Sequence, residues 1–329
     1  INGFGRIGRL IFRIMDQDSD FEIVAINDLT DAEQLAYLLK YDTAHRLYRK
    51  EEISFEGDML VVGDKKIKVL SEKDPALLPW KELNVDLVYE CTGLFTSEEK
   101  ARAHIEAGAK KVVISAPAKG NVKTVVYNVN HDILTKEDKI ISAASCTTNC
   151  LAPVLNVIDK EFGIASGYMT TVHAYTNDQA NLDVAHKKGI YARRGRASAA
   201  NIVPTSTGAA SAIGKVIPSL DGKLSGMAMR VPVVTGSVVD LVLKLKKNTT
   251  KEEINEVLKN NQNETLGYTT DPIVSSDVIG MSYGSLVDGL LTSVNKTEDG
   301  ELVKIIAWYD NEMSYSYQMV RCAKYFLSL

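Results

Sequence analysis

The sequence predicts an α/β protein of two domains, a doubly wound parallel sheet followed by an α+β domain with a mixed or antiparallel sheet. Short apolar runs alternate with helical patterns in the first half of the chain, whereas long strand-like runs dominate after residue 146. The length, 329 residues, is also more than one domain of ordinary size requires. We therefore expect domains over residues 1–145 and 146–312, with a terminal helix over 313–329 that packs back on the first domain.

Strands in the first half are predicted where apolar runs end at polar or small residues. These runs are Phe21–Ile26, Leu87–Cys91 and Lys111–Ser115. A helix is predicted between the last two runs, over Ser97–Ala107, because Ser97 can cap it and Gly108 can end it. Alternating strands and helices favour a parallel sheet, whose ligands bind at the carboxyl ends of its strands.

The second half begins with a predicted helix and continues mainly as strands. Apolar residues follow helical spacing from Cys146 to Phe162, and Gly163 ends the run. Another helix is predicted over Lys251–Lys259, where Thr250 and Glu253 are placed as a capping box. The predicted strands are Ser166–Ala174, Leu224–Val234, Ser237–Leu245, Ser285–Val294 and Leu302–Tyr309.

Composition argues against several classes of function. The formal net charge is −4, which provides no basic field for nucleic acid or an acidic membrane. We find no apolar run of membrane-spanning length and no signal peptide, so we expect a cytoplasmic protein. The four cysteines, Cys91, Cys146, Cys150 and Cys322, are too few for a disulfide framework. Beyond Cys146 and Cys150, no second pair of Cys or His residues has zinc spacing, so we expect no metal site.

A glycine-rich segment at the start of the chain predicts a dinucleotide site. Gly3, Gly5 and Gly8 fit the pattern G-x-G-x-x-G, whose glycines let the backbone approach a pyrophosphate at a helix N-terminus. Asp28 follows a predicted strand, twenty residues after Gly8, and can accept hydrogen bonds from an adenosine ribose. Because the sequence begins at Ile1, the strand that normally precedes the glycines is nearly absent, and we expect further residues before it.

Two segments, 145–150 and 171–176, predict covalent chemistry. Cys146 opens a predicted helix, and His173 lies on the next predicted strand. A helix N-terminus and a nearby imidazole both lower the pKa of a thiol, and the thiolate is the attacking group. The alternative is that His173 is a satisfied histidine on a half-buried strand, but Thr171, Thr176 and the cysteine segment beside it favour a catalytic role.

Arg230 stands inside an otherwise apolar predicted strand. A buried guanidinium needs an anion as its partner, and phosphate is the natural one. The segment Thr205–Gly208 could be only a turn. On composition alone, the basic residues Arg193, Arg194 and Arg196 are typical of a solvated loop.

Together these motifs resemble the family of phosphorylating glyceraldehyde-3-phosphate dehydrogenases. The resemblance covers essentially the whole chain and implies a Rossmann NAD-binding domain followed by a catalytic domain. The segments that carry it are INGFGRIGR at the start, ECTG at 90–93, ISAPAKG at 114–120, ASCTTNC at 144–150, TTVHAYT at 170–176, STGAA at 206–210 and WYDNE at 308–312.

The resemblance implies a glycolytic reaction, oxidation of glyceraldehyde 3-phosphate to 1,3-bisphosphoglycerate with reduction of NAD. Cys146 would attack the aldehyde to form a thiohemiacetal, and inorganic phosphate would later cleave the resulting thioester. His173 would activate the thiol and act as base, so that the rate would depend on a group that titrates near neutrality. The backbone nitrogen of Cys146 would steady the oxyanion.

The resemblance also implies two anion subsites and a cofactor site. One anion subsite comprises Ser145, Thr147, Thr207 and Gly208, and the other comprises Thr176 and Arg230, with Arg194 nearby. Cofactor contacts are implied for Gly3, Gly5, Arg6, Ile7, Gly8, Asp28, Lys73, Thr92, Gly93, Ser115 and Asn311. Arg6, Ile7 and Asp28 would hold the adenosine and pyrophosphate end. Lys73 and Ser115 would line the same cleft, and Asn311 would hold the nicotinamide carboxamide.

The loop Asn181–Asn201 departs from the family pattern. It is longer than the common bacterial form, and Val184-Ala185 replaces the usual Leu-Pro before His186. Family members that also use NADP carry small residues at this pair, so some NADP use stays open beside NAD, although Asp28 favours NAD. The resemblance further implies a homotetramer with this loop in the subunit interface.

Two other functions stay open on the sequence. Erythrose-4-phosphate dehydrogenase would share the cysteine and the histidine but would hydrolyse the thioester, whereas the complete set of anion-site residues favours phosphorolysis. A redox-sensing or surface-binding protein would need only a reactive thiol at Cys146. Such a protein would have no reason to keep Asp28, Arg230 and Asn311 together.

Overall fold

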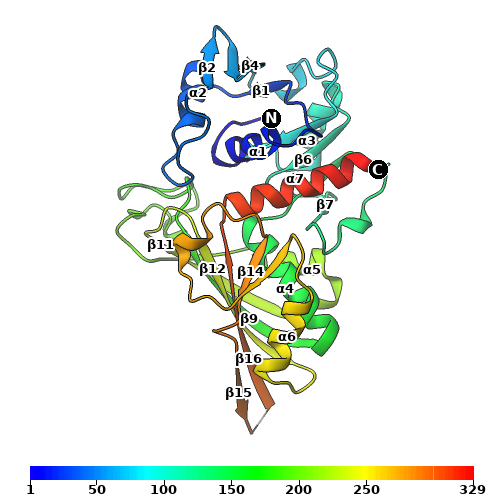
Figure 1. The fold of residues 1–329 in the computed structure, drawn as a ribbon, viewed down its shortest axis with the longest axis vertical. Helices are drawn as coiled ribbons and strands as arrows, with labels where there is room; N and C mark the ends of the chain where they lie inside the picture. The colour runs from blue at the N-terminus through cyan, green and yellow to red at the C-terminus, as the bar shows by residue number, and fades with distance from the viewer. Residues whose placement is uncertain (299) are drawn as a thin grey trace. The chain divides into compact units, whose positions relative to one another are not determined.

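The computed structural model describes residues 1–298 and 300–329, and the chain divides into two compact units. Unit 1 comprises Ile1–Tyr127, His131–Ala144 and Ser316–Leu329, and unit 2 comprises Asn128–Asn130 and Ser145–Tyr315. Figure 1 labels many of the helices and strands of each unit. Within the described ranges, no helix is both long and apolar enough to cross a bilayer.

Unit 1 carries the first eight strands and three complete helices. The helices are α1 (Arg6–Asp16), α2 (Ala32–Lys40) and α3 (Glu98–Glu106), joined by most of α7 (Met313–Ser328). The strands are β1 (Ala25–Asn27), β2 (Ile53–Glu56), β3 (Met59–Val62), β4 (Lys65–Leu70), β5 (Leu87–Glu90), β6 (Lys111–Ile114), β7 (Lys123–Thr124) and β8 (Ile140–Ser142).

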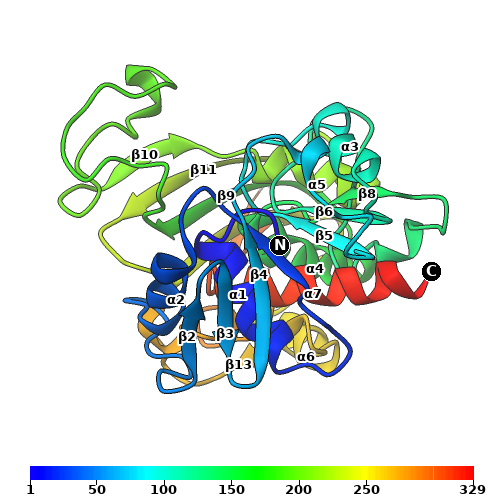
Figure 2. The same ribbon diagram turned by 90° about the horizontal axis from the view of Figure 1, so that it is seen from above.

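Asn2 connects the two groups of strands in unit 1. The groups have the orders β1-β4-β3-β2 and β5-β6-β8-β7, and Figure 2 shows β2, β3 and β4 side by side. Asn2 makes parallel bridges to Asn27 at the end of β1 and to Glu90 at the end of β5. The carboxyl ends of β1 and β5 therefore lie on either side of Asn2. This is the edge at which a parallel sheet binds its ligands.

Helix α1 follows the glycine segment closely because two positions there tolerate no side chain. Gly3 has φ +88°, and a Cβ on it would lie 2.8 Å from the backbone nitrogen of Thr92. A Cβ on Gly8 would lie 2.1 Å from the carbonyl oxygen of Gly3. The helix buries Leu10 and Ile11 completely, which fixes it against the sheet.

The last helix, α7, packs on unit 1 from Ser316 onward. Lys324 pairs with Asp18 at 2.7 Å, and the ammonium of Lys111 donates to the carbonyl of Phe326. These contacts join the end of the chain to its first hundred or so residues.

Unit 2 is an eight-stranded mixed sheet with three helices. The strands are β9 (Ile164–Ala174), β10 (Val203–Ser206), β11 (Leu224–Val231), β12 (Ser237–Leu245), β13 (Leu266–Thr269), β14 (Ser285–Asp288), β15 (Ser293–Thr297) and β16 (Gly300–Tyr309). The helices are α4 (Cys146–Phe162), α5 (Ala209–Val216) and α6 (Lys251–Asn260).

The sheet of unit 2 has helices packed on one of its faces. Its order is β10-β11-β9-β12-β16-β14-β13, with β15 paired to β16, and β9 runs parallel to β11 but antiparallel to β12. The mixed sheet expected for this part of the chain is confirmed. Helix α4 contacts β9, β12, β14 and β16, while α5 contacts β11 (Figure 1). Tyr168 on β9 points to the other face and is 71% exposed.

Local signals in the sequence located most helix ends. Ser97 accepts the N–H of Lys100 as the cap of α3, Gly163 ends α4 with φ +69°, and Thr250 and Glu253 form the expected capping box. The strand predicted over Ser285–Val294 is wrong, because Asp288 accepts the N–H of Leu290 and turns the chain between β14 and β15. The sequence analysis also predicts neither α2 nor the strands β2–β4.

Candidate active site

Cys146 and His173 meet at the start of α4. The Sγ of Cys146 lies 3.4 Å from Nε2 of His173. Ser145 caps the helix by accepting the N–H of Thr148 at 3.1 Å, so that Cys146 is the first helical residue. The hydroxyl of Ser145 also lies 2.8 Å from that of Thr148, which commits this side chain to the cap.

Strand register places Arg230 beside His173. The two residues are partners in the parallel pair β9–β11, and partners project to the same face of a sheet. Nη1 of Arg230 donates to the carbonyl of Ala174 at 3.1 Å and to the hydroxyl of Thr176 at 2.9 Å. Two residues far apart in sequence therefore contribute a base and a cation to one site.

Two groups contact Nδ1 of His173. The carbonyl of Ala174, which can only accept, lies 2.6 Å away, and Nη1 of Arg230, which can only donate, lies 3.1 Å away. The shorter contact favours a proton on Nδ1. In that tautomer Nε2 is the unprotonated nitrogen, which has the geometry to accept the thiol proton of Cys146.

Burial sets the protonation of the pair, and the expected lowering of the thiol pKa is wrong here. Burial raises the pKa of the Cys146 thiol, although the charge of Arg230 opposes this. Burial and then the charge of Arg230 lower the pKa of His173 to about 3. Both shifts favour a thiol beside a neutral imidazole at neutral pH.

A cavity of about 220 Å³ opens beside this pair. It is lined by Thr147, Thr171, His173, Lys188, Arg194, Ser206, Thr207, Gly208, Ala228 and Arg230. Gly208 caps α5 without a side chain, so backbone N–H groups at the helix start can bind an anion. Three cationic side chains and a helix N-terminus make the cavity suited to phosphate.

Asp178, which no sequence motif singled out, organises the cationic side of this site. Its carboxylate forms an ion pair with Arg194 and accepts the hydroxyl of Thr176. Nε of Arg194 also donates to the hydroxyl of Thr205 at 3.2 Å. In the sequence, Asp178 could have been recognised as a partner for these groups because it stands two residues after Thr176.

Tyr309 is a second residue that the sequence analysis leaves without a role. Its hydroxyl lies 3.0 Å from that of Thr147 and 2.8 Å from that of Thr171. Its ring meets the imidazole of His173 edge-on, with centroids 5.9 Å apart. The tyrosine therefore holds Thr147 and supports the imidazole from β16.

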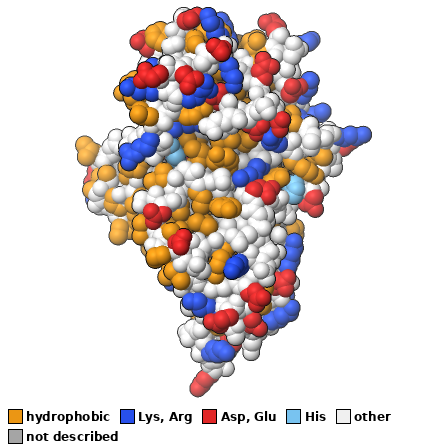
Figure 3. Space-filling view, viewed as in Figure 1, with side chains coloured by type: hydrophobic (Ala, Val, Ile, Leu, Met, Phe, Trp, Pro, Cys, Tyr) orange, Lys and Arg blue, Asp and Glu red, His pale blue; other side chains and the backbone are white. Residues whose placement is uncertain are grey.

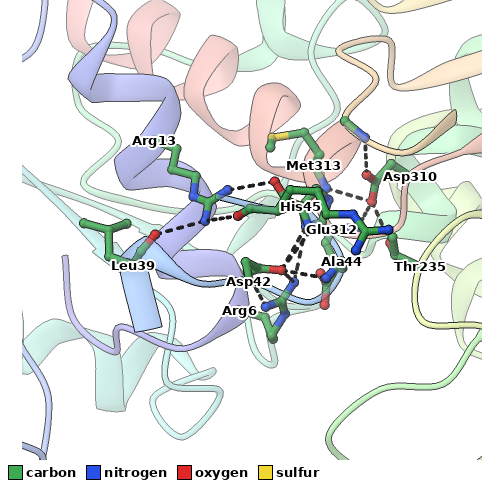
Figure 4. Close-up of polar contacts among 12 residues, drawn as sticks. Arg6, Arg13, Leu39, Asp42, Ala44, His45, Thr235, Asp310, Glu312 and Met313 are labelled. Atoms are coloured by element: carbon green, nitrogen blue, oxygen red, sulfur yellow. Dashed lines mark hydrogen bonds and ion pairs between the residues drawn. The ribbon is translucent and has the colours of Figure 1, made fainter. Parts of the chain in front are cut away.

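Asn311 is fixed by hydrogen bonds to its side-chain oxygen. Oδ1 accepts the hydroxyl of Ser237 at 2.9 Å and the N–H of Gly236 at 3.2 Å. The neighbouring carboxylate of Asp310 accepts from Thr235 and from the N–H of Met313, as Figure 4 shows. These contacts fix the orientation of the Asn311 amide.

Unit 1 contains a cavity of about 500 Å³ at the carboxyl ends of its strands. Of the predicted cofactor residues, Gly3, Gly5, Asp28, Lys73 and Thr92 line it. Its other lining residues are Asn2, Asn27, Leu29, Glu72, Cys91, Leu94 and Phe95. Arg6, Ile7, Gly8, Gly93 and Ser115 are not among the lining residues.

The wall of this cavity fits a dinucleotide. Gly5 caps α1 without a side chain, and no heavy atom lies within 4 Å of the position its Cβ would take. A pyrophosphate can therefore reach the N–H groups at the start of α1. Oδ2 of Asp28 accepts the N–H of Phe4 at 2.7 Å, which leaves Oδ1 for a ribose hydroxyl.

Arg6 does not offer its guanidinium to this cavity. Both Nη atoms bind Asp42, and Figure 4 shows the pair beside Ala44 and His45. Arg6 and Ile7 stand at the first positions of α1, so their backbone N–H groups are what they can contribute to a phosphate.

Comparison with known families agrees with this geometry. Residues 1–98 match the NAD binding domain of glyceraldehyde 3-phosphate dehydrogenase, and residues 145–311 match its C-terminal domain. The chain belongs to the glyceraldehyde 3-phosphate dehydrogenase family. The family indicated by the sequence motifs is confirmed, and the matched NAD binding domain of that family coincides with the part of unit 1 that carries the glycine segment.

Curated relatives extend over the whole chain. The glyceraldehyde-3-phosphate dehydrogenase of Clostridium pasteurianum is 56% identical over 329 residues, which is 100% of this chain and 98% of the relative. The enzymes of that name from Clostridium acetobutylicum and Streptococcus pyogenes are 55% and 54% identical, with the same coverage.

Proposed function

We propose that this chain oxidises glyceraldehyde 3-phosphate to 1,3-bisphosphoglycerate, using NAD and inorganic phosphate. The observation that carries the proposal is the thiol of Cys146, 3.4 Å from the imidazole of His173 and next to a cationic cavity. A thiol and a base serve acyl transfer, and the cationic cavity suits a phosphorylated substrate. The family names of the relatives supply the identity of the sugar phosphate.

The first steps use Cys146 and His173. The sulfur adds to the aldehyde carbon while the thiol proton passes through Nε2 of His173 to the carbonyl oxygen, which gives a thiohemiacetal. The neutral imidazole then takes the hydroxyl proton as hydride leaves the carbon, and a thioester remains. The backbone N–H of Cys146, at the start of α4, is placed to stabilise the negative oxygen.

The last step uses the anion cavity. A phosphate oxygen attacks the thioester carbon and the carbon–sulfur bond breaks. The sulfur takes the proton that His173 gained in the oxidation, and the proton of the attacking phosphate passes to solvent. Thr207, Gly208 and Arg194 are suited to hold the attacking phosphate, while Arg230 and Thr176 are suited to hold the phosphate of the sugar.

NAD, when bound, accepts the hydride. In unit 1, Gly5 and the first N–H groups of α1 are suited to the pyrophosphate, and Asp28 to the adenosine ribose. A carboxylate at the ribose disfavours the extra phosphate of NADP, so we propose NAD as the main cofactor. Asn311, from unit 2, is the candidate for the nicotinamide carboxamide.

The decisive experiment is formation of NADH from glyceraldehyde 3-phosphate, with and without inorganic phosphate. Fast turnover that requires phosphate is the expected result. A rate that is indifferent to phosphate would indicate hydrolysis of the thioester. Erythrose 4-phosphate would then be the substrate to test, as for erythrose-4-phosphate dehydrogenase.

We further propose that the chain assembles as a homotetramer in the cytoplasm. The loop Asn181–Asn201 exposes apolar side chains, with Ile190 82% and Tyr191 88% exposed, and Figure 2 shows this stretch projecting from β10 and β11. Hydrophobic side chains also gather over the strands of unit 2 in Figure 3. All four cysteines are free thiols, which favours a reducing compartment. Light scattering on Tyr191→Glu and on the unaltered protein tests the assembly, and equal masses would contradict a role of this loop.

A further inference from the structure

A buried chain of hydrogen bonds lies beneath the cofactor cavity of unit 1. It consists of Trp80, His104 and Glu90, which are 1%, 0% and 0% exposed. The indole N–H of Trp80 donates to Nδ1 of His104 at 3.0 Å, and Nε2 of His104 lies 2.9 Å from Oε2 of Glu90. These three side chains are not among those that line the cavity.

Trp80 fixes the hydrogen-bonding role of His104. An indole N–H can only donate, so Nδ1 of His104 must accept. In a neutral imidazole the proton is then on Nε2, which donates to Glu90. Trp80 therefore orients the ring so that Nε2 of His104 faces Glu90.

Glu90 also accepts hydrogen bonds from one wall of the cavity. Its Oε1 accepts the backbone N–H of Thr92 at 2.8 Å and also the hydroxyl of Thr92. That hydroxyl accepts the N–H of Leu94 at 3.1 Å. The N–H and the hydroxyl of Thr92 thus share one buried acceptor, so the turn Thr92–Leu94 is held in one position.

Glu90 also holds a second wall. Its Oε2 accepts the side-chain amide of Asn2 at 2.6 Å, and Asn2 accepts that of Asn27 at 2.7 Å. Oδ1 of Asn27 accepts the N–H of Glu72 at 2.8 Å. Because Asn2, Asn27 and Glu72 all line the cavity, one buried carboxylate fixes both of its sides.

We propose that Glu90, supported by Trp80 and His104, is a positioning residue for NAD. It sets Thr92 and Asn2 in the arrangement that receives the cofactor. The inference rests on the proposed use of NAD by unit 1. Because the reacting groups Cys146 and His173 belong to unit 2, Glu90 should determine the affinity for NAD and leave the chemistry unaffected.

The test compares Glu90→Gln with Glu82→Gln, an exposed glutamate of the same unit. A glutamine must point its NH₂ group at the donors of Thr92 or at those of Asn2 and His104, so one arm of the network is lost. Calorimetry on protein purified without cofactor should give a dissociation constant for NAD that is about tenfold higher for E90Q, and unchanged for E82Q.

Two further measurements separate positioning from a general loss of structure. Amide hydrogens in residues 87–95 should exchange faster in E90Q before NAD is added, because the N–H of Thr92 loses its acceptor. The KM for inorganic phosphate and the rate of alkylation of Cys146 should not change. A merely structural role would lower the active fraction and leave the affinity of the remaining protein for NAD intact.

Equal dissociation constants for NAD in E90Q and the unaltered protein would overturn the inference. If the unaltered protein fails to bind NAD, the proposed function falls and the inference with it. If E90Q loses its cooperative thermal transition, Thr92→Val takes its place, because it removes only the hydroxyl of a partly exposed residue. That variant should bind NAD about threefold more weakly, and equal binding would overturn the inference.

Discussion

The cavities of the two units are built from different parts of the chain. In unit 2, the reactive groups are side chains, Cys146, His173 and Arg230, which a helix start and a strand register bring together. In unit 1, the wall at Gly3 and Gly5 is backbone, side chains such as Asp28 line the rest of the cavity, and Glu90 supports two of its sides from below. Removal of a side chain should therefore lower the function of unit 2 most. Addition of atoms next to the backbone should lower the function of unit 1 most.

This difference also predicts which variants change the catalytic rate and which change the affinity for NAD. The groups of unit 2 are suited to make and break bonds, so their loss should appear in kcat. The backbone donors proposed for unit 1 would hold a cofactor whether or not it reacts, so changes there should appear in the dissociation constant of NAD. Variants in the two units can therefore be told apart by kinetics and calorimetry together.

The largest effect is expected for Cys146→Ser. A hydroxyl is a far weaker nucleophile than a thiol, so kcat should fall on the order of 10⁴-fold or more. The binding of NAD by calorimetry should not change. Cys150→Ser, four residues further along α4 and fully buried, is the matched control and should retain most of the rate. Normal turnover by C146S would rule out the covalent mechanism.

His173→Asn should have the next largest effect. Loss of the general base should lower kcat by about 10²- to 10⁴-fold. Because the pKa of His173 is about 3, its neutral form is already present throughout the neutral range. The sequence-based expectation of a group near neutrality is therefore wrong for His173, and its titration should not produce a step in the rate there. A step between pH 6 and 7 that disappears in H173N would contradict the lowered pKa.

Gly5→Ala and Gly8→Ala separate the binding of NAD by unit 1 from the stability of unit 1. The methyl group at position 5 meets no protein atom within 4 Å but occupies the space of the pyrophosphate. The dissociation constant of G5A for NAD should rise about tenfold or more, and its melting temperature should not change. The methyl group at position 8 would lie 2.1 Å from a carbonyl oxygen, so G8A should also lose about 1–3 kcal/mol of stability. Unchanged NAD binding in G5A would disprove a pyrophosphate at this helix.

The last effect concerns the stability of the protein in acid and leaves the rate at neutral pH unchanged. His173 stays neutral in the folded state down to about pH 3, whereas in the unfolded chain it takes up a proton below its ordinary pKa of 6.5. Its contribution is therefore complete above pH 6.5 and is lost as the pH falls towards 3, by at most about 1.4 kcal/mol per pH unit. Chemical unfolding of the unaltered protein and of H173N should show a shallower slope for the variant. Equal slopes would contradict the burial argument.

Local signals predicted much of the fold and of the site. Ser97, Thr250 and Gly163 were assigned to helix ends because capping depends on a few neighbouring residues. The strands β2–β4 were not predicted, because short strands are stabilised by pairing with one another more than by their own pattern. The run Ser285–Val294 was predicted as one strand because the turn at Asp288 depends on a side-chain hydrogen bond.

The sequence by itself determined the family and the glycine turn and predicted Cys146 as the nucleophile, because each of these depends on consecutive residues. Tertiary structure decided how these parts work together. Only the register of β9 and β11 places Arg230 beside His173, and only the folded chain brings Asp178 to Arg194 and Tyr309 to Thr147. Only burial sets the pair Cys146 and His173 as thiol and neutral imidazole, because the cost of charge depends on removal from water, which no local pattern records.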